Sequence, residues 1–347
     1  MRTNTNITIS DVAKHAGVSK STVSNYLNGK YEKMAAETKL AVERTIKELG
    51  YTPNLSARRL PNKEKSKTIC LIIPRNLTRL FDSMYYPMVF HSIEKLAERM
   101  KYNILIYSRN RSDQTNEMLF LKGMASSMVD GFIIFDLQEN DLFFKEFEEA
   151  KIPYVCVGNI DGYDDYRYVA SDHKKAVEDV MEYLIQLGHR KIGIFRQSDI
   201  GVVEAVRGRA ISAISEKHKL GSDDIQSIRI PVKSADQEIY DIWKDVLTKP
   251  DRPTAYIISS AVRQPFLMVV QDLGLSVPED LSYVNIEYYR RNSSSIENQT
   301  RVESRAGEIA EIAFKKLLRN IYNPTLEFRS QMISLDFFIG TTTAALK

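Results

Sequence analysis

The chain is poor in the residue types and motifs that carry covalent chemistry. Its 347 residues include two cysteines and one tryptophan, and its five histidines are scattered without the spacing of metal ligands. Cys70 and Cys156 lie inside apolar runs, which predicts buried free thiols. The sequence has no GxSxG elbow, Walker loop, GxGxxG turn or HExxH helix. We therefore expect no enzymatic activity, no cofactor and no metal.

Long hydrophobic runs are also missing. Nowhere do about eighteen apolar residues follow one another, which is what a membrane-spanning helix requires. Residues 1–10 are polar and contain no apolar core of a signal peptide. These absences predict a cytoplasmic protein with no membrane partner.

Charge is distributed unevenly along the chain. Residues 1–67 contain thirteen Lys and Arg against six Asp and Glu, whereas residues 68–347 contain thirty-five against thirty-nine. A basic segment attracts nucleic acid because neutralising backbone phosphates releases condensed counterions. The amino-terminal segment is therefore a candidate for binding double-stranded DNA.

Two short helices joined by a tight turn are predicted over residues 8–29. Thr8 stands three residues before Asp11, the spacing of a capping box, so a helix should begin near Ile9. Gly17 can turn the chain with positive φ, and Ser19 can cap the second helix. The first helix presents one apolar stripe, made of Ile9, Val12, Ala13 and Ala16.

The second predicted helix has two unlike faces. At about 100° per residue, its outward face carries Lys20, Ser21, Ser24, Asn25 and Asn28. The opposite face carries Thr22, Val23, Tyr26 and Leu27. A docked apolar face and a free polar face are typical of a helix that reads the major groove. The alternative is a helix pair whose polar face only meets water, and the caps and the basic charge together favour DNA.

A third helix and a linker follow. The helix should run from about Ala36 to Leu49 with Gly50 just past its end. Its inward residues are expected to be Leu40, Val42, Ile46 and Leu49. The next segment holds helix-forming residues between Pro53 and Pro61, too few for a stable isolated helix. We expect it to become ordered only on binding.

The motif of residues 8–29, the linker Pro53-Asn54 … Ala57-Arg58-Arg59-Leu60 and the stretch 187–192 resemble the lactose-repressor (LacI/GalR) family of bacterial transcription regulators. The resemblance covers essentially the whole chain. It implies an all-α helix-turn-helix headpiece over residues 1–52 and a hinge helix with linker over 53–66. Residues 67–347 would form an α/β effector domain of the two-lobed, periplasmic-binding-protein type I, with parallel doubly wound sheets.

The resemblance also implies which residues touch DNA. Lys20, Ser21 and Asn25 match base-reading positions, and Ser24 shares their face. Phosphate-contacting or capping positions are matched by Thr8, Ser19, Thr22 and Asn28. In the hinge, the implied DNA-binding residues are Asn54, Ala57, Arg58 and Leu60. The leucine at the place of Leu60 is wedged into a base step of the minor groove, which kinks the duplex; the alternative is that Leu60 packs on the effector domain.

Three positions depart from the family pattern in the amino-terminal region. Asn25 replaces the more usual arginine, and asparagine suits adenine where arginine suits guanine. Ala35 stands where a Ser or Thr usually caps the third helix. Pro61 disfavours helical dihedral angles at Leu60, so the hinge helix should stop abruptly.

From residue 68 onward, short apolar runs alternate with amphipathic stretches, which predicts parallel sheet covered by helices. The runs are 68–73, 102–107, 131–135, 154–157, 191–195, 225–230, 254–258 and 281–286. About 280 residues exceed one ordinary core, so two lobes are expected. The resemblance implies an N-lobe of about 67–168 and 299–327, and a C-lobe of about 169–298 and 328–347, joined by crossings around a hinged cleft.

Ligands of such sheets bind beyond the carboxyl ends of the strands. The candidate effector-binding residues there are Arg75, Asn76, Arg111, Arg196, Ser198, Ser260 and Glu287. Ala205 and Ala261 replace an arginine and an acid that sugar- and purine-responsive relatives usually carry, so the effector stays unnamed. Several arginines at strand ends favour a carbohydrate-related anion such as a phosphorylated sugar; the alternative is that they are only solvated.

The favoured function is a homodimeric transcriptional regulator, a repressor, that binds a palindromic operator and is controlled by a small molecule in the cleft. A solute-binding protein of the same two-lobed fold is the alternative, which the basic headpiece and the missing export signal disfavour. An enzyme on a doubly wound sheet has no support beyond analogy of fold.

Overall fold

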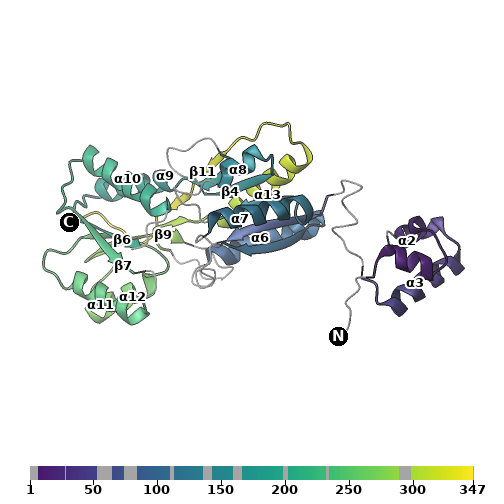
Figure 1. Cartoon of the computed structure of the whole chain (residues 1–347). Coiled ribbons are helices and arrows are strands. Elements are labelled where there is room, and N and C mark those ends of the chain that lie inside the picture. Colours follow the sequence, from purple (N-terminus) through teal and green to yellow (C-terminus); the bar gives the residue numbers. More distant parts are fainter. Residues whose placement is uncertain are drawn as a thin grey trace. The chain divides into compact units, whose positions relative to one another are not determined.

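The computed structural model describes residues 7–27, 29–52, 65–73, 84–109, 113–135, 143–158, 166–197, 202–231, 234–288 and 298–346, with the backbone alone at 143, 197, 202, 287 and 288. The chain divides into two compact units, residues 1–66 and 67–347 (Figure 1). Each is described by itself.

Three α-helices and a short 3-10 turn make up the described part of the first unit. They are α1 (Ile9–His15), α2 (Lys20–Leu27), η1 (Tyr31–Lys33) and α3 (Ala36–Leu49). Their shared core is built on Val12, Ala13, Val23 and Val42. Gly50 ends α3 with φ of 60°, a left-handed conformation that glycine adopts without strain.

One predicted core residue of α3 is on the surface. Leu40 is 65% exposed, whereas Thr45 is buried. Val42 sets the buried face of α3, and two residues correspond to about 200° of helix rotation, which places Leu40 on the opposite side. Thr45 lies three residues after Val42 and therefore shares its face.

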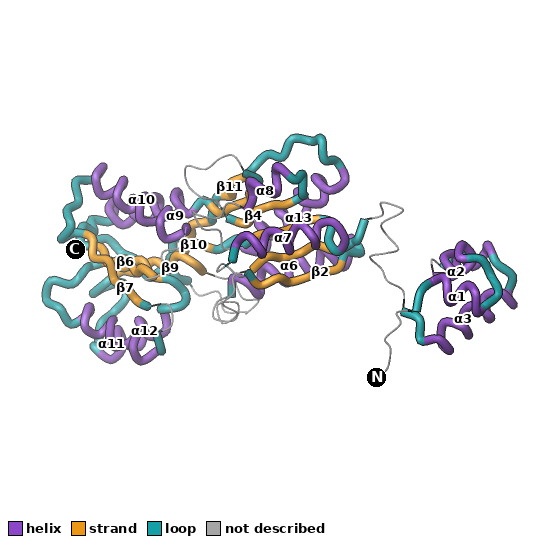
Figure 2. Tube along the Cα trace, viewed as in Figure 1, coloured by secondary structure: helices purple, strands orange, loops and turns teal. Residues whose placement is uncertain are grey.

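The second unit contains two six-stranded sheets (Figure 2). The first has the order β11-β5-β4-β3-β1-β2 and is parallel throughout. Its strands are β1 (Thr68–Ile73), β2 (Asn103–Ser108), β3 (Gly131–Ile134), β4 (Tyr154–Val157), β5 (Tyr168–Ser171) and β11 (Gln331–Ile333). Helices α6 (Tyr85–Met100) and α13 (Ala306–Tyr322) cover one face, and α7 (Gln114–Ser127) and α8 (Phe143–Glu149) cover the other.

The second sheet has the order β12-β10-β9-β8-β6-β7. Its strands are β6 (Ile192–Gln197), β7 (Ile225–Ile230), β8 (Ala255–Ile258), β9 (Ser282–Tyr288), β10 (Arg301–Glu303) and β12 (Asp336–Phe338). Helices α9 (His173–Gln186) and α10 (Val202–Lys217) cover one face, and α11 (Asp236–Leu247) and α12 (Arg263–Asp272) the other. The edge strand β12 runs antiparallel to β10, so this sheet is not purely parallel.

All eight predicted strands are confirmed, but the predicted lobe boundaries need correction. Residues 169–171 and 331–333 pair in the first sheet, although they were assigned to the C-lobe. Residues 301–303 pair in the second sheet, although they were assigned to the N-lobe. The chain therefore passes between the sheets after β5, after β10 and after β11. The strands beside these crossings have only three or four residues, too few for a clear apolar pattern.

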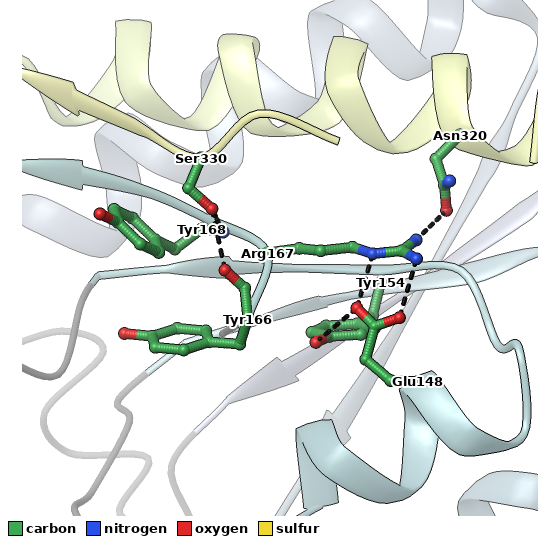
Figure 3. Close-up of polar contacts among 7 residues, drawn as sticks. All are labelled: Glu148, Tyr154, Tyr166, Arg167, Tyr168, Asn320 and Ser330. Carbon is green, nitrogen blue, oxygen red and sulfur yellow. Dashed lines mark hydrogen bonds and ion pairs between the residues drawn. The ribbon is translucent and has the colours of Figure 1, made fainter. Parts of the chain in front are cut away.

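A polar cluster ties α13 and the segment that leads into β11 to the first sheet (Figure 3). Arg167 pairs with both carboxylate oxygens of Glu148, at 2.7 Å from Nε and 2.9 Å from Nη2, and also donates to Asn320 Oδ1 at 2.6 Å. Nearby, Ser330 Oγ donates to the Tyr166 carbonyl at 2.8 Å and accepts from the Tyr168 amide at 3.1 Å. The segment that leads into β11 is thus tied to the start of β5.

Replacing Arg167 by Ala should destabilise the effector domain. The change leaves the half-buried Glu148 carboxylate without its cationic partner, so we expect a loss of about 1–3 kcal/mol in the free energy of unfolding. Urea unfolding measures the loss. Arg329→Ala is the control, because Arg329 pairs with Glu327 at an exposed site and should contribute little. Equal effects of the two substitutions would contradict the anchoring role.

Candidate DNA-binding surface and ligand site

The capping box predicted at the start of α1 is present. Thr8 Oγ1 accepts from the Asp11 amide at 3.4 Å, and Asp11 Oδ2 accepts from the Thr8 amide at 2.8 Å. These hydrogen bonds from Thr8 hold the pKa of Asp11 below its ordinary value. Gly17 follows α1 with φ of 64°, as expected for the turn into α2.

Ser19 begins α2 in the predicted manner. Its Oγ accepts from the Thr22 amide at 3.1 Å and lies 2.7 Å from Ser21 Oγ and 2.9 Å from Thr22 Oγ1. A side-chain cap of this type typically stabilises a helix by about 1 kcal/mol. The hydroxyls of Ser19, Ser21 and Thr22 therefore form one cluster at the amino end of α2.

The two faces of α2 are arranged as the periodicity predicts. Val23 is fully buried in the three-helix core, and Tyr26 and Leu27 pack against that core. On the other side, Lys20 and Ser21 are exposed, and Ser24 and Asn25 are half-buried. The helix therefore presents a short polar surface made of Lys20, Ser21, Ser24 and Asn25, which we call the α2 polar face. These residue types donate and accept hydrogen bonds at base edges.

Several predicted contact residues lie outside the described parts of the chain. Of the DNA-binding set these are Asn28, Asn54, Ala57, Arg58 and Leu60, and with them the whole predicted hinge helix. Of the effector-binding set they are Arg75, Asn76, Arg111 and Ser198, and the side chain of Glu287.

Arg196 and Ser260 lie at the carboxyl edge of the second sheet. The order of strands reverses between β6 and β8, and the crevice at such a switch point is where open α/β sheets bind ligands. Arg196 is at the end of β6, and Ser260 follows β8. The side-chain Nδ2 of the buried Asn285 on β9 donates to Ser260 Oγ at 3.1 Å. The neighbouring Ser259 is buried, and its Oγ has no hydrogen-bond partner in the described part of the chain.

Arg196 is held by the first turn of α10. Its Nε donates to Glu204 Oε2 at 2.9 Å, and its Nη2 donates to the Glu204 carbonyl at 3.1 Å. A Cβ atom on Gly208 would lie 3.1 Å from Arg196 Nη2, so glycine there lets the guanidinium lie flat against the helix. The other oxygen of Glu204 accepts from Arg207 Nη1 at 3.2 Å. One carboxylate is therefore shared by two guanidinium groups.

His173 completes this cluster at the start of α9. Its Nδ1 lies 3.5 Å from Arg207 Nη2, which makes the neutral imidazole an acceptor. Burial, together with the Arg207 charge, lowers the pKa of His173 to about 3. Sequence reasoning did not single out Glu204, Arg207, His173 or Asn285, because none of them ends a predicted strand with a family-like pattern. The available signal was the spacing of Glu204 and Arg207, because an acid and an arginine three residues apart on a helix can form an ion pair.

Within the described residues, no helix is both long and apolar enough to cross a membrane. The same residues contain no group of three or more His, Cys, Asp or Glu that could hold a metal ion. Cys70 and Cys156 are buried free thiols.

Comparison with known protein families matches both units. Residues 8–54 match the model of bacterial regulatory proteins of the lacI family, and residues 181–343 match that of a periplasmic-binding-protein-like domain. The chain is 27% identical over 332 residues to catabolite control protein A of Priestia megaterium, covering 93% of this chain and 95% of that protein.

Solved structures share the fold. One is the lac repressor dimer bound to operator and the anti-inducer ONPF, with a TM-score of 0.73, 20% identity and coverage of 98% of this chain and 99% of that one. Another is the complex of transcriptional regulator CelR with cellobiose, with a TM-score of 0.65, 21% identity and coverage of 97% and 99%.

The helix-turn-helix and the periplasmic-binding-protein-like domain together define a DNA-binding transcription regulator, and not an enzyme. Residues 8–54 therefore form a LacI-family DNA-binding domain, and the chain continues into a periplasmic-binding-protein-like domain, as in the regulators to which it is similar.

The lowered pKa of His173 predicts a pH dependence of stability. The ordinary pKa of histidine is 6.5, and the pKa of His173 in the folded protein is about 3. As the pH falls below 6.5, His173 therefore becomes protonated in the unfolded chain but stays neutral in the folded chain. Stability should therefore fall between pH 6.5 and 3, by about 1–2 kcal/mol from pH 7 to pH 5 for this group. Urea unfolding at the two pH values should show a smaller loss for His173→Gln than for the unchanged chain. The same loss in both proteins would contradict the assignment.

Proposed function

We propose that the protein is a homodimeric repressor in which each headpiece reads one half of a near-palindromic operator. The observation that carries the proposal is the α2 polar face, which is displayed by a capped helix in a unit with an excess of basic residues. In helix-turn-helix proteins the second helix enters the major groove, and dimer symmetry is matched by operator symmetry. The basic residues would add affinity for phosphates that is independent of sequence.

Within this proposal, Lys20, Ser21 and Asn25 contact base edges. Thr8, Ser19 and Thr22 position the helix through caps and phosphates, and Leu60 wedges into the minor groove between the half-sites. The Asn25 amide can donate to N7 and accept from N6 of one adenine. The operator should therefore carry an A·T pair where relatives with arginine at this position select G·C.

Asn25→Ala should weaken operator binding by about 1–3 kcal/mol and relax base choice at the contacted position only. Selection of bound DNA from a random library, followed by titration of the selected site, measures both effects. Arg44→Ala is the control, because Arg44 is an exposed residue of α3 that pairs with Glu48, and its loss should leave the base preference unchanged. A guanine selected opposite the wild-type Asn25, or an unaltered base preference in the variant, would contradict the role.

A second copy of the chain is the proposed occupant of an apolar surface on the effector domain. The edge strand β2 exposes 54% of Ile106, and α7 exposes 64% of Leu119 and 54% of Phe120. Tyr107 of β2 and Phe120 of α7 are in ring contact at 5.5 Å, so the two elements form one surface. An open sheet edge with large apolar neighbours is a typical site of association. A dimer that reads both halves of a palindromic operator requires an interface of this kind between its two copies.

Phe120→Asp should convert the dimer to a monomer, because a carboxylate would be desolvated at the interface. Light scattering coupled to size exclusion measures the change in mass. Met268→Asp, an exposed apolar residue of α12 in the other lobe, is the matched control. If Phe120→Asp remains dimeric, this surface is not the interface.

The proposed regulator is a small, carbohydrate-related effector that binds at the carboxyl edges of the two sheets. The candidates for binding it are the residues at the strand ends, including Arg196 and Ser260. A ligand that binds one arrangement of the lobes better than another would shift operator affinity, and operator would shift ligand affinity by the same factor. A solute-binding protein would use the same two lobes but would have no use for the α2 polar face, so it is disfavoured.

A further inference from the structure

A row of polar side chains crosses the carboxyl edge of the second sheet. Arg196 on β6 is the register partner of Arg229 on β7. On the other side of β6, Ile194 pairs with Ile257 of β8. Continuing this register by two residues places Ser259, just after β8, level with Arg196. Alternate residues share a face, and Ile194 and Ile257 both pack in the core under α9 and α10. Arg229, Arg196 and Ser259 therefore line up on that face, next to the first turn of α10.

Positive charge in this row exceeds the negative charge available to it. Glu204 is shared between Arg196 and Arg207. Arg229 has no acidic partner among the described residues. His173 is neutral and accepts from Arg207, and the nearby Asp172 is engaged as the cap of α9, accepting from the Lys175 amide at 2.9 Å. Among the described residues, the neighbouring Arg196 and Arg229 are thus balanced by one carboxylate, which Arg207 also uses.

This arrangement carries two costs in the free protein. Like charges on register partners of neighbouring strands repel each other. Ser259 is 1% exposed, and its buried hydroxyl makes no hydrogen bond in the described part of the chain. A buried hydroxyl without a hydrogen-bond partner lowers the stability of the folded protein, and binding of a partner removes this cost. A single anionic group between the two strand ends would remove both costs, because guanidinium groups and a hydroxyl are all donors to oxyanions.

We propose that the row formed by Arg196, Arg229 and Ser259 binds an anionic group of the effector, a phosphate or a carboxylate. The proposal rests on the proposed function, since it names the chemical class of the molecule that controls operator binding. The two arginines supply charge and Ser259 supplies a neutral donor. Glu204 keeps Arg196 and Arg207 in place when the ligand is absent.

Isothermal titration of the full-length protein tests the ligand class. The probes are inorganic phosphate and three related sugars: glucose, glucose 6-phosphate and gluconate. We expect binding of one or more anionic probes and none of glucose. Binding of the phosphate probes alone identifies a phosphate site, and binding of gluconate alone identifies a carboxylate site. Binding of glucose alone, or of no probe, would overturn the proposal.

Three variants locate the binding anion. Arg229→Gln should raise the Kd of the anionic probe that binds by about tenfold. Ser259→Ala should raise it about threefold and leave the Tm of the free protein unchanged or higher, because a buried hydroxyl without a partner is lost. Arg190→Gln removes the same charge at the opposite end of β6, where Arg190 contacts the His218 and Lys219 carbonyls, and should change Kd less than twofold. An equal effect of Arg190→Gln and Arg229→Gln would show a general charge effect and overturn the proposal.

Operator selection by the same preparations separates the two proposals. If the unchanged protein selects an operator but binds none of the anionic probes, the anionic class is wrong and the repressor proposal stands. If no operator is selected, the repressor proposal fails whatever the anions do.

Discussion

The packing of Val23 into the three-helix core is the constraint on which DNA recognition depends. Val23 is fully buried among Val12, Ala13 and Val42, and a helix with one side fixed in a core can present only the other side to a partner. The α2 polar face follows from this constraint without further assumption. The capping hydrogen bonds at Thr8 and Ser19 set where each helix begins, and therefore which residues point outward.

The effector domain is organised by its crossings. The chain passes between the sheets after β5, β10 and β11, and each crossing begins at a strand of three or four residues. Arg305 links two of the crossings, because it pairs with Glu308 at the start of α13 and donates to the Ser334 carbonyl between β11 and β12 at 3.2 Å. Short segments that carry few contacts are where lobes move relative to each other in proteins of this architecture. A ligand that binds the arginines at the carboxyl edge of the second sheet would act close to the crossing after β5. His173, the partner of Arg207, is the first residue of α9, and α9 follows β5 directly.

Sequence reasoning recovered the elements with strong local signals. Capping spacing located α1, and apolar runs located eight of the strands in the two sheets, because buried parallel strands read as nearly continuous hydrophobic segments. It misplaced Leu40, because apolarity was counted without fixing the helix phase on Val42. It missed β5, β10, β11 and β12, whose pairing depends on distant partners rather than on local pattern.

The polar cluster at the carboxyl edge of the second sheet was predicted only in part. The sequence placed Arg196 and Ser260 at strand ends, because the carboxyl ends of strands are predictable, and their role in binding a ligand stays a prediction. Glu204, Arg207 and His173 were not, since the contacts between α9 and α10 that bring them together arise from tertiary packing.

Selection of DNA fragments by the purified full-length protein, at moderate ionic strength, tests the central claim most directly. The account predicts enrichment of one inverted repeat whose half-sites are each read by one headpiece. Recovery of fragments with no preference over bulk competitor DNA, with and without the anionic probes, would contradict it.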